Sequence, residues 1–211
     1  MKHTTRLVSS GMRSAAPALL FFIFLSATGC GDSSPHIVPM PPGAVILAFG
    51  DSLTSGYGAD LAESYPAVLE RLTGYKVINA GISGEVSAQG LKRLPALLDR
   101  HQPDLVILCH GANDLLRRLD RENTVANLRQ MITSARASGA QVLLVGVPQP
   151  GLLLHPADFY THLAKELDIP CETDIILDIL TTKAEKSDAI HPNAAGYRRL
   201  AETLAKRIVE E

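Results

Sequence analysis

The sequence predicts an α/β fold of three layers, in which helices cover both faces of a mainly parallel sheet of about five strands. Short apolar runs of five or six residues alternate with longer amphipathic stretches, and this alternation favours parallel strands that are buried on both faces. Glycine and polar residues follow each of the first three apolar runs. Because parallel strands end at a common edge, these residues should gather there and form a site.

The strands are predicted by apolar runs that lack helical spacing. They comprise residues 45–49, 76–80, 105–109 and 142–147. Residues 175–180 are also apolar, and their pattern leaves a strand and a loop both open. The 211 residues are enough for one domain with a substantial core.

Five helices are predicted by apolar residues spaced three and four apart. Ser64 and Asn193 are candidate N-caps, Gly74 and Gly139 end two of the helices, and Pro95 should kink one of them. The predicted helices comprise residues 64–73, 90–101, 124–138, 159–167 and 194–209.

The N-terminal part of the chain has the pattern of an export signal. Basic residues precede an apolar stretch at 15–26, which is the length of a secretory apolar region and short for a bilayer span. Small residues then precede Cys30, as in the bacterial lipobox, although Ala27 stands where leucine is usual. We expect a lipoprotein signal peptide at 1–29, a lipidated Cys30 with a tether at 30–43, and the domain at 44–211. An ordinary cleaved signal with an incidental Cys30 is the alternative.

Charge and composition narrow the class of partner. Cleavage after residue 29 removes three basic residues and leaves a net charge of −5. A protein without a basic excess, with no tryptophan and 5% aromatic residues, is not expected to bind nucleic acid. We expect a monomer on the periplasmic side of a membrane, held by the lipid on Cys30. Gly31 follows Cys30 where an inner-membrane lipoprotein of enteric bacteria has aspartate, which favours the outer membrane.

Cysteine and metal patterns predict no cofactor. Apart from Cys30, the only cysteines are Cys109 and Cys171, so packing must supply the core, and Cys109 is expected to be a buried apolar residue. A disulfide between these two cysteines is the alternative. The spacings typical of metal sites and of nucleotide-binding loops do not occur, and we expect neither a metal nor a cofactor.

Three groups suited to nucleophilic acyl transfer lie far apart in the chain. Ser52 follows the first predicted strand, and Asp188 stands three residues before His191. A serine hydroxyl is a weak nucleophile until a base takes its proton, and an imidazole oriented by a carboxylate can take that proton and return it. This chemistry requires the fold to bring residue 52 beside residue 191.

The blocks GDSLTSGYG, NAGISGE, GAND and DAIHPN, in this order, resemble those of the SGNH (GDSL) hydrolase family. The resemblance covers residues 44–208 and is strongest to bacterial secreted arylesterases, acyl-CoA thioesterases and lysophospholipases. It implies a flavodoxin-like SGNH hydrolase fold. It also implies Ser52 as nucleophile, His191 as general base and acid, and Asp188 as the residue that orients His191. The implied oxyanion hole comprises the backbone N–H groups of Ser52 and Gly81 and the side-chain amide of Asn113.

Other polar residues in these blocks receive simpler interpretations. Many family members have a second glycine where this chain has Ala112, and a positive φ there would strain alanine by about 1–2 kcal/mol. We expect Asp51 to stabilise its turn, Glu85 to start the following helix, and Asp114 to hold its loop. His110 is expected to pack near the site without taking part in the chemistry.

The sequence therefore predicts a serine esterase that acts on aryl or short-to-medium acyl esters, with thioesters and lysophospholipids as further candidates. The expected partner is a small-molecule ester or a lipid. Two alternatives stay open: a carbohydrate O-acetylesterase on the same scaffold, and a lipoprotein that binds acyl or glycan ligands without turning them over.

Overall fold

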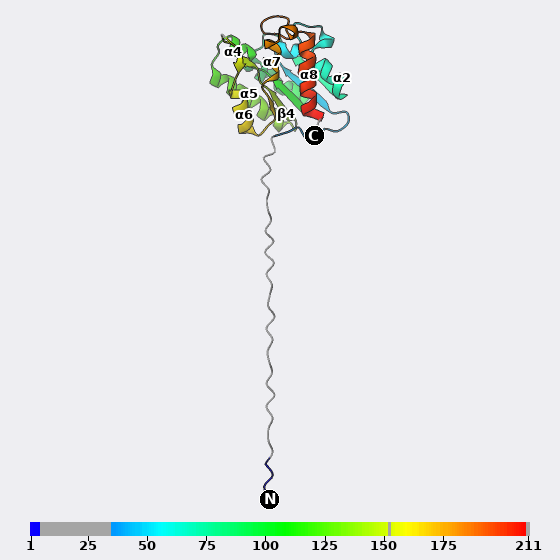
Figure 1. The fold of residues 1–211 in the computed structure, drawn as a ribbon, viewed down its shortest axis with the longest axis vertical. Helices are drawn as coiled ribbons and strands as arrows, with labels where there is room; N and C mark the ends of the chain where they lie inside the picture. Colours follow the sequence, from blue (N-terminus) through cyan, green and yellow to red (C-terminus); the bar gives the residue numbers. More distant parts are fainter. Residues whose placement is uncertain (5–34, 152, 210–211) are drawn as a thin grey trace. The chain divides into compact units, whose positions relative to one another are not determined.

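Five parallel strands form the central sheet in the order β2-β1-β3-β4-β7. They are seen in a computed structural model that describes residues 1–4, 35–151 and 153–209 (Figure 1). The strands are β1 (Val45–Gly50), β2 (Lys76–Gly81), β3 (Leu105–Cys109), β4 (Gln141–Val145) and β7 (Cys171–Glu172). A small antiparallel hairpin joins β5 (Pro148–Gln149) to β6 (His155–Pro156).

Helices form the two outer layers of the fold. Helix α2 (Tyr65–Thr73) packs against α8 (Ala194–Val209) on one side of the sheet, and α3 (Ser87–His101) packs against α5 (Arg121–Ala137). Figure 1 shows α2 and α8 on one side and α5 with α6 on the other. The remaining helices are α1 (Ser52–Ser55), α4 (Ala112–Leu116), α6 (Phe159–Leu167) and α7 (Ile175–Thr181), with short 3₁₀ turns at Leu61–Glu63 and Lys183–Glu185. The three-layer α/β/α prediction is confirmed.

The first four predicted strands and the five predicted helices occur close to their expected bounds. Helices α3 and α5 each begin three residues before the predicted start. Helix α5 does so because the side chain of Asp120 accepts the N–H of Asn123. Asn193 caps α8, since its side-chain oxygen accepts the N–H groups of Ala195 and Gly196. Ser64 stands before α2 but donates its hydroxyl to the carbonyl of Leu61 instead of capping.

Residues 175–180 form a helix, so both interpretations offered for them, strand and loop, are wrong. The carboxylate of Glu172 accepts the N–H groups of Asp174 and Ile175, which supplies acceptors at the start of α7. The isoleucines of α7 are then buried against the rest of the domain. The fifth strand is β7, whose two residues are too few to give a hydropathy signal.

Part of the predicted tether belongs to the domain. Ile37 and Met40 are buried, and the backbone of Val38 exchanges two hydrogen bonds with the side chain of Gln141 at the start of β4. The prediction of a tether is therefore wrong for residues 37–43. The predicted signal sequence from residue 5, Cys30 and the rest of the tether to residue 34 lie outside the described residues. Among the described helices, none has the length and apolar character needed to cross a bilayer.

Cys109 and Cys171 are free thiols. Cys109 is fully buried at the end of β3, as predicted, and Cys171 is half-buried in β7. Packing supplies the core, because the apolar side chains of β1, β3 and β4 have almost no exposed surface.

Candidate active site

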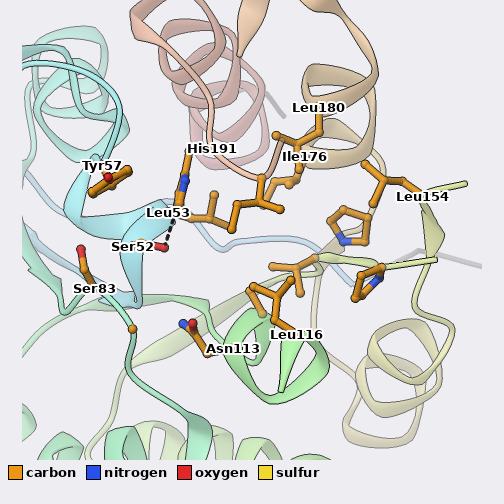
Figure 2. A pocket seen from close by; sticks show the side chains of 16 residues that line it. Ser52, Leu53, Tyr57, Ser83, Asn113, Leu116, Leu154, Ile176, Leu180 and His191 are labelled. Carbon is orange, nitrogen blue, oxygen red and sulfur yellow. Dashed lines mark hydrogen bonds between the residues drawn. The ribbon is translucent and has the colours of Figure 1, made fainter. Parts of the chain in front are cut away.

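The segments that follow β1, β2 and β3 meet at the carboxyl edge of the sheet, as predicted from their glycine and polar residues. Ser52 begins α1 after β1, Ser83 lies in the loop after β2, and Asn113 lies in α4 after β3. The segment before α8 brings His191 to the same place, although it is far from Ser52 in the sequence. Figure 2 shows these side chains around one pocket.

Ser52, His191 and Asp188 form a continuous hydrogen-bonded series. The Nε2 atom of His191 lies 3.0 Å from Oγ of Ser52, and its Nδ1 atom lies 2.8 Å from Oδ2 of Asp188. The ring of Tyr57 covers the imidazole, with ring centroids 4.5 Å apart. The structure therefore brings together the three side chains that the sequence placed far apart.

The carboxylate of Asp188 controls the tautomer of His191. Burial by itself raises the pKa of Asp188, but hydrogen bonds from the backbone of Ile190 and from His191 outweigh burial and lower that pKa below its ordinary value. An ionised Asp188 accepts the proton on Nδ1, which leaves the lone pair of Nε2 facing the hydroxyl of Ser52. This arrangement can remove the hydroxyl proton.

The turn at Ser52 is built around Asp51. One carboxyl oxygen of this buried residue accepts the N–H of Leu53, as predicted, and the other has no hydrogen-bond partner among the described residues. Burial raises the pKa of Asp51, because the charged form loses hydration. Ser52 is the first residue of α1, so its backbone N–H has no acceptor within that helix.

The structure places Gly84, and not Gly81, at the pocket. Gly81 is the last residue of β2 and donates its N–H to the side chain of Asn79 at 3.0 Å, away from the pocket lining. Gly84 lines the pocket with a φ of +80°. The prediction that Gly81 supplies an oxyanion donor is therefore corrected. The block contains both glycines, and choosing between them requires knowing where β2 ends.

Asn113 also lines the pocket, and Ala112 does not strain its loop. The positive φ of this loop, +108°, belongs to Gly111, while Ala112 has a negative φ. A Cβ at Gly111 would lie 2.7 Å from the hydroxyl of Tyr160. Alanine at position 112 is therefore neutral, and the strain considered for it does not arise. Asp114 holds the loop as expected, because its carboxylate accepts both the N–H and the hydroxyl of Ser87.

An apolar pocket of about 230 Å³ extends from Ser52 and His191. Figure 2 shows it running toward Leu154, Ile176 and Leu180, which lie at the end away from the serine. Further apolar lining comes from Leu53, Ala112, Leu116, Val147, Pro148, Pro150 and Ile190. The pocket can hold an apolar chain beside the serine hydroxyl. In the part of the chain that the structure describes, no group of three or more His, Cys, Asp or Glu side chains is arranged to hold a metal.

A serine, an imidazole and a carboxylate joined in this order beside an apolar pocket define the class of serine hydrolases. Residues 48–199 match the GDSL-like lipase/acylhydrolase family, and the chain belongs to that family. It is an ester hydrolase with a five-stranded SGNH fold.

Two curated relatives and one solved structure support this assignment. Thioesterase 1/protease 1/lysophospholipase L1 of Escherichia coli (strain K12) is 37% identical over 171 residues, which cover 77% of this chain and 82% of the relative. The arylesterase of Vibrio mimicus is 35% identical over 177 residues, which cover 78% and 88%. The psychrotrophic esterase EstA of Pseudoalteromonas sp. superposes with a TM-score of 0.69 at 25% identity, over 77% of this chain and 95% of that one.

Proposed function

We propose that the protein hydrolyses aryl and short-to-medium-chain acyl esters through an acyl-enzyme formed on Ser52. The observation that carries this proposal is the 3.0 Å contact between Ser52 and His191 at the mouth of an apolar pocket. In the first half-reaction Oγ of Ser52 bonds to the carbonyl carbon while its proton passes to Nε2 of His191. His191 then gives that proton to the alcohol oxygen as the ester C–O bond breaks. Water repeats the sequence and releases the acid.

We assign the oxyanion hole to the backbone N–H groups of Ser52 and Gly84 and the side-chain amide of Asn113. All three residues line the pocket. The N–H of Gly84 donates to no acceptor within the described residues, which supports its use by a substrate. Removal of one such donor typically lowers kcat by about 10²–10³-fold, so we expect that loss in Asn113→Ala.

The apolar lining supports an acyl or aryl group as the part of the substrate that enters the pocket. Thioesters and lysophospholipids share such an acyl group, and the names of the Escherichia coli relative include both activities. A carbohydrate O-acetylesterase would need polar groups to bind sugar hydroxyls, and nine of the pocket residues are leucine, isoleucine, valine or proline. We therefore place the acyl esterase ahead of the deacetylase.

The test is hydrolysis of p-nitrophenyl esters of increasing chain length, with labelling by a fluorophosphonate as a second readout. Ser52→Ala should lower kcat by about 10⁴-fold or more and abolish labelling. Ser55→Ala is the matched control, because its hydroxyl lies nearby and bonds to the carbonyl of Ser52 and to the hydroxyl of Ser83, and no imidazole is among its partners. Full turnover by Ser52→Ala would refute the proposal.

We further propose that residues 1–29 are an export signal and that a lipid on Cys30 anchors the enzyme. The enzyme would be a monomer on the periplasmic side of the outer membrane. The pattern of basic, apolar and small residues before Cys30 supports this. Mass spectrometry of the mature N-terminus should find a lipid on Cys30, and Cys30→Ser should move the protein to the soluble fraction. An unmodified N-terminus would contradict the anchor and leave the esterase proposal intact.

A further inference from the structure

Glu85, next to Gly84, is a buried carboxylate that accepts hydrogen bonds from two side chains. It is 6% exposed. Arg93 donates to it through Nε at 2.7 Å and Nη2 at 2.7 Å, and Nε2 of His110 lies 3.1 Å away. The prediction that Glu85 starts the following helix is wrong, because α3 begins at Ser87 and the carboxylate turns inward.

Arg93 connects this carboxylate to the strands that carry the site. Its Nη2 atom also donates to the carbonyls of Gly50, 3.2 Å away, and Ala80, 2.7 Å away. Gly50 stands two residues before Ser52, and Ala80 lies near the end of β2. The guanidinium group packs on the ring of Phe49, 4.1 Å from its centroid. The Glu85–Arg93 pair thus joins the carboxyl ends of β1 and β2.

His110 extends the same network to β3. The ring is fully buried, and its Nδ1 atom accepts the N–H of Gly111 at 3.0 Å. Nδ1 therefore carries no proton, so Nε2 carries one and donates it to Glu85. Gly90 of α3 leaves the space for this ring, because a Cβ there would lie 2.5 Å from Nε2. The imidazole acts as a hydrogen-bond donor to Glu85 beneath the site.

Asn113 depends on the backbone of Glu85. Its Nδ2 atom donates to the carbonyl of Glu85 at 3.1 Å. A carbonyl only accepts, so this contact determines which end of the amide is nitrogen. One of the two N–H groups on Nδ2 is used, and the second is left for the pocket that Asn113 lines.

We propose that Glu85 is a positioning residue for ester hydrolysis: its carboxylate, held by Arg93 and His110, fixes the backbone on which Gly84 and the amide of Asn113 are oriented. This inference rests on the oxyanion hole assigned above. Arg93 and His110 then act by holding Glu85 in place, and neither residue contacts the substrate.

The negative charge of Glu85 is needed for this arrangement. Burial raises the pKa of Glu85, but the hydrogen bonds from His110 and Arg93 outweigh burial and lower it overall, so the group is ionised. Both oxygens of the carboxylate then accept. In Glu85→Gln one of the two positions becomes an NH₂ group, which cannot accept from Arg93 or His110. At least one donor would lose its partner, and the loop would shift.

The first test compares Glu85→Gln with the matched variant Asp104→Asn. Asp104 joins strands at the opposite end of the same sheet, where its carboxylate accepts the N–H of Val45 at 2.8 Å. Because a small misplacement of a catalytic group can cost about 100-fold, Glu85→Gln should lower kcat by about 10- to 100-fold. KM should not change, and an alkyl trifluoromethyl ketone, which mimics the tetrahedral intermediate, should bind more weakly by the same factor. Asp104→Asn should leave kcat and the affinity for the ketone at their wild-type values.

A double-mutant cycle with Asn113→Ala separates positioning from general destabilisation. If Glu85 acts through Asn113, Glu85→Gln should lower kcat less in the Asn113→Ala background than in wild type. Arg93→Lys, which keeps the charge but cannot reach the carboxylate and two carbonyls together, should reproduce the kcat loss if Glu85→Gln does not fold.

The outcomes distinguish this inference from the proposal beneath it. If Asn113→Ala lowers kcat but Glu85→Gln leaves kcat at the wild-type value, the role of Glu85 is overturned and the oxyanion hole still stands. Equal losses from Glu85→Gln in both backgrounds would do the same. Wild-type kcat in Asn113→Ala would overturn the oxyanion hole, and with it the role of Glu85, while the nucleophile assignment would still stand on Ser52→Ala.

Discussion

Both carboxyl oxygens of Asp188 bind His191. Oδ1 accepts the backbone N–H of His191 at 2.8 Å, and Oδ2 lies 2.8 Å from its Nδ1 atom. Oδ1 also accepts the N–H of Ile190 at 2.8 Å. Two backbone donors therefore determine that the atom in the Oδ1 position must be an acceptor, and only the other oxygen faces the ring.

This relationship predicts that Asp188→Asn is at least as damaging as Asp188→Ala. The amide oxygen would occupy the Oδ1 position, so its NH₂ group would face Nδ1 and force the proton onto Nε2, where it blocks proton transfer from Ser52. In another serine hydrolase this wrong tautomer lowers kcat by about 10⁴-fold. Asp188→Ala leaves Nδ1–H to water and preserves the useful tautomer. The measurement is kcat with a p-nitrophenyl ester, and a faster Asp188→Asn than Asp188→Ala would contradict the argument.

Asp51→Asn should change the pH dependence of stability. Burial raises the pKa of Asp51 above its ordinary value of 3.8, so the folded state binds this proton more tightly than the unfolded state. The associated stability is present below pH 3.8 and is lost as pH rises through the raised pKa. Asparagine does not titrate. The Tm of Asp51→Asn minus the Tm of wild type should therefore increase with pH.

Thermal unfolding across a pH series checks this expectation, with Asp60→Asn as the control because Asp60 is exposed. The amide that replaces the unpartnered oxygen adds an offset that does not vary with pH, so the slope is the decisive quantity. A Tm difference independent of pH would show that Asp51 titrates alike in both states.

Leu154→Trp should shorten the preferred acyl chain. Leu154 lines the far end of the pocket and is half-buried, so a larger ring can occupy the pocket without entering the core. Since one methylene in an apolar pocket is worth about 10-fold or more in kcat/KM, the ratio of kcat/KM for octanoyl over acetyl esters should fall by at least that factor. Leu153→Trp is the control, because Leu153 is 80% exposed and outside the pocket lining. Equal ratios in the two variants would place the acyl chain elsewhere.

Ile37→Ala should destabilise the domain without affecting catalysis. Ile37 is 6% exposed in the segment that the sequence assigned to a tether. Loss of a buried isoleucine typically costs about 2 kcal/mol or more of unfolding free energy, measurable by urea denaturation. Val38→Ala should cost much less, because the side chain of Val38 is 59% exposed. If the two variants are equally stable, residues 37–43 do not form part of the domain.

Local patterns were sufficient for most of the fold. Parallel strands such as β3 are buried on both faces and appear as continuous apolar runs. The spacing of apolar residues predicts the amphipathic helices. The residue types at turns indicate Ser52, Asp188 and His191 as candidate catalytic groups. The errors arose where apolar periodicity carries no information. Residues 37–43 depend on Gln141, about a hundred residues further along the chain. Helix α7 starts at acceptors supplied by the nearby carboxylate of Glu172, and that carboxylate is held by Arg207, which is distant in sequence.

By itself, the sequence determined the class of fold, the family and the three groups at the centre of the site. Only the tertiary structure decided that Gly84 and not Gly81 reaches the pocket, and that Glu85, Arg93 and His110 form one buried network below it. The physical reason is that propensity and periodicity act between near neighbours in the chain. Hydrogen bonds between buried polar groups depend on which segments the completed sheet brings within 3 Å or so of each other.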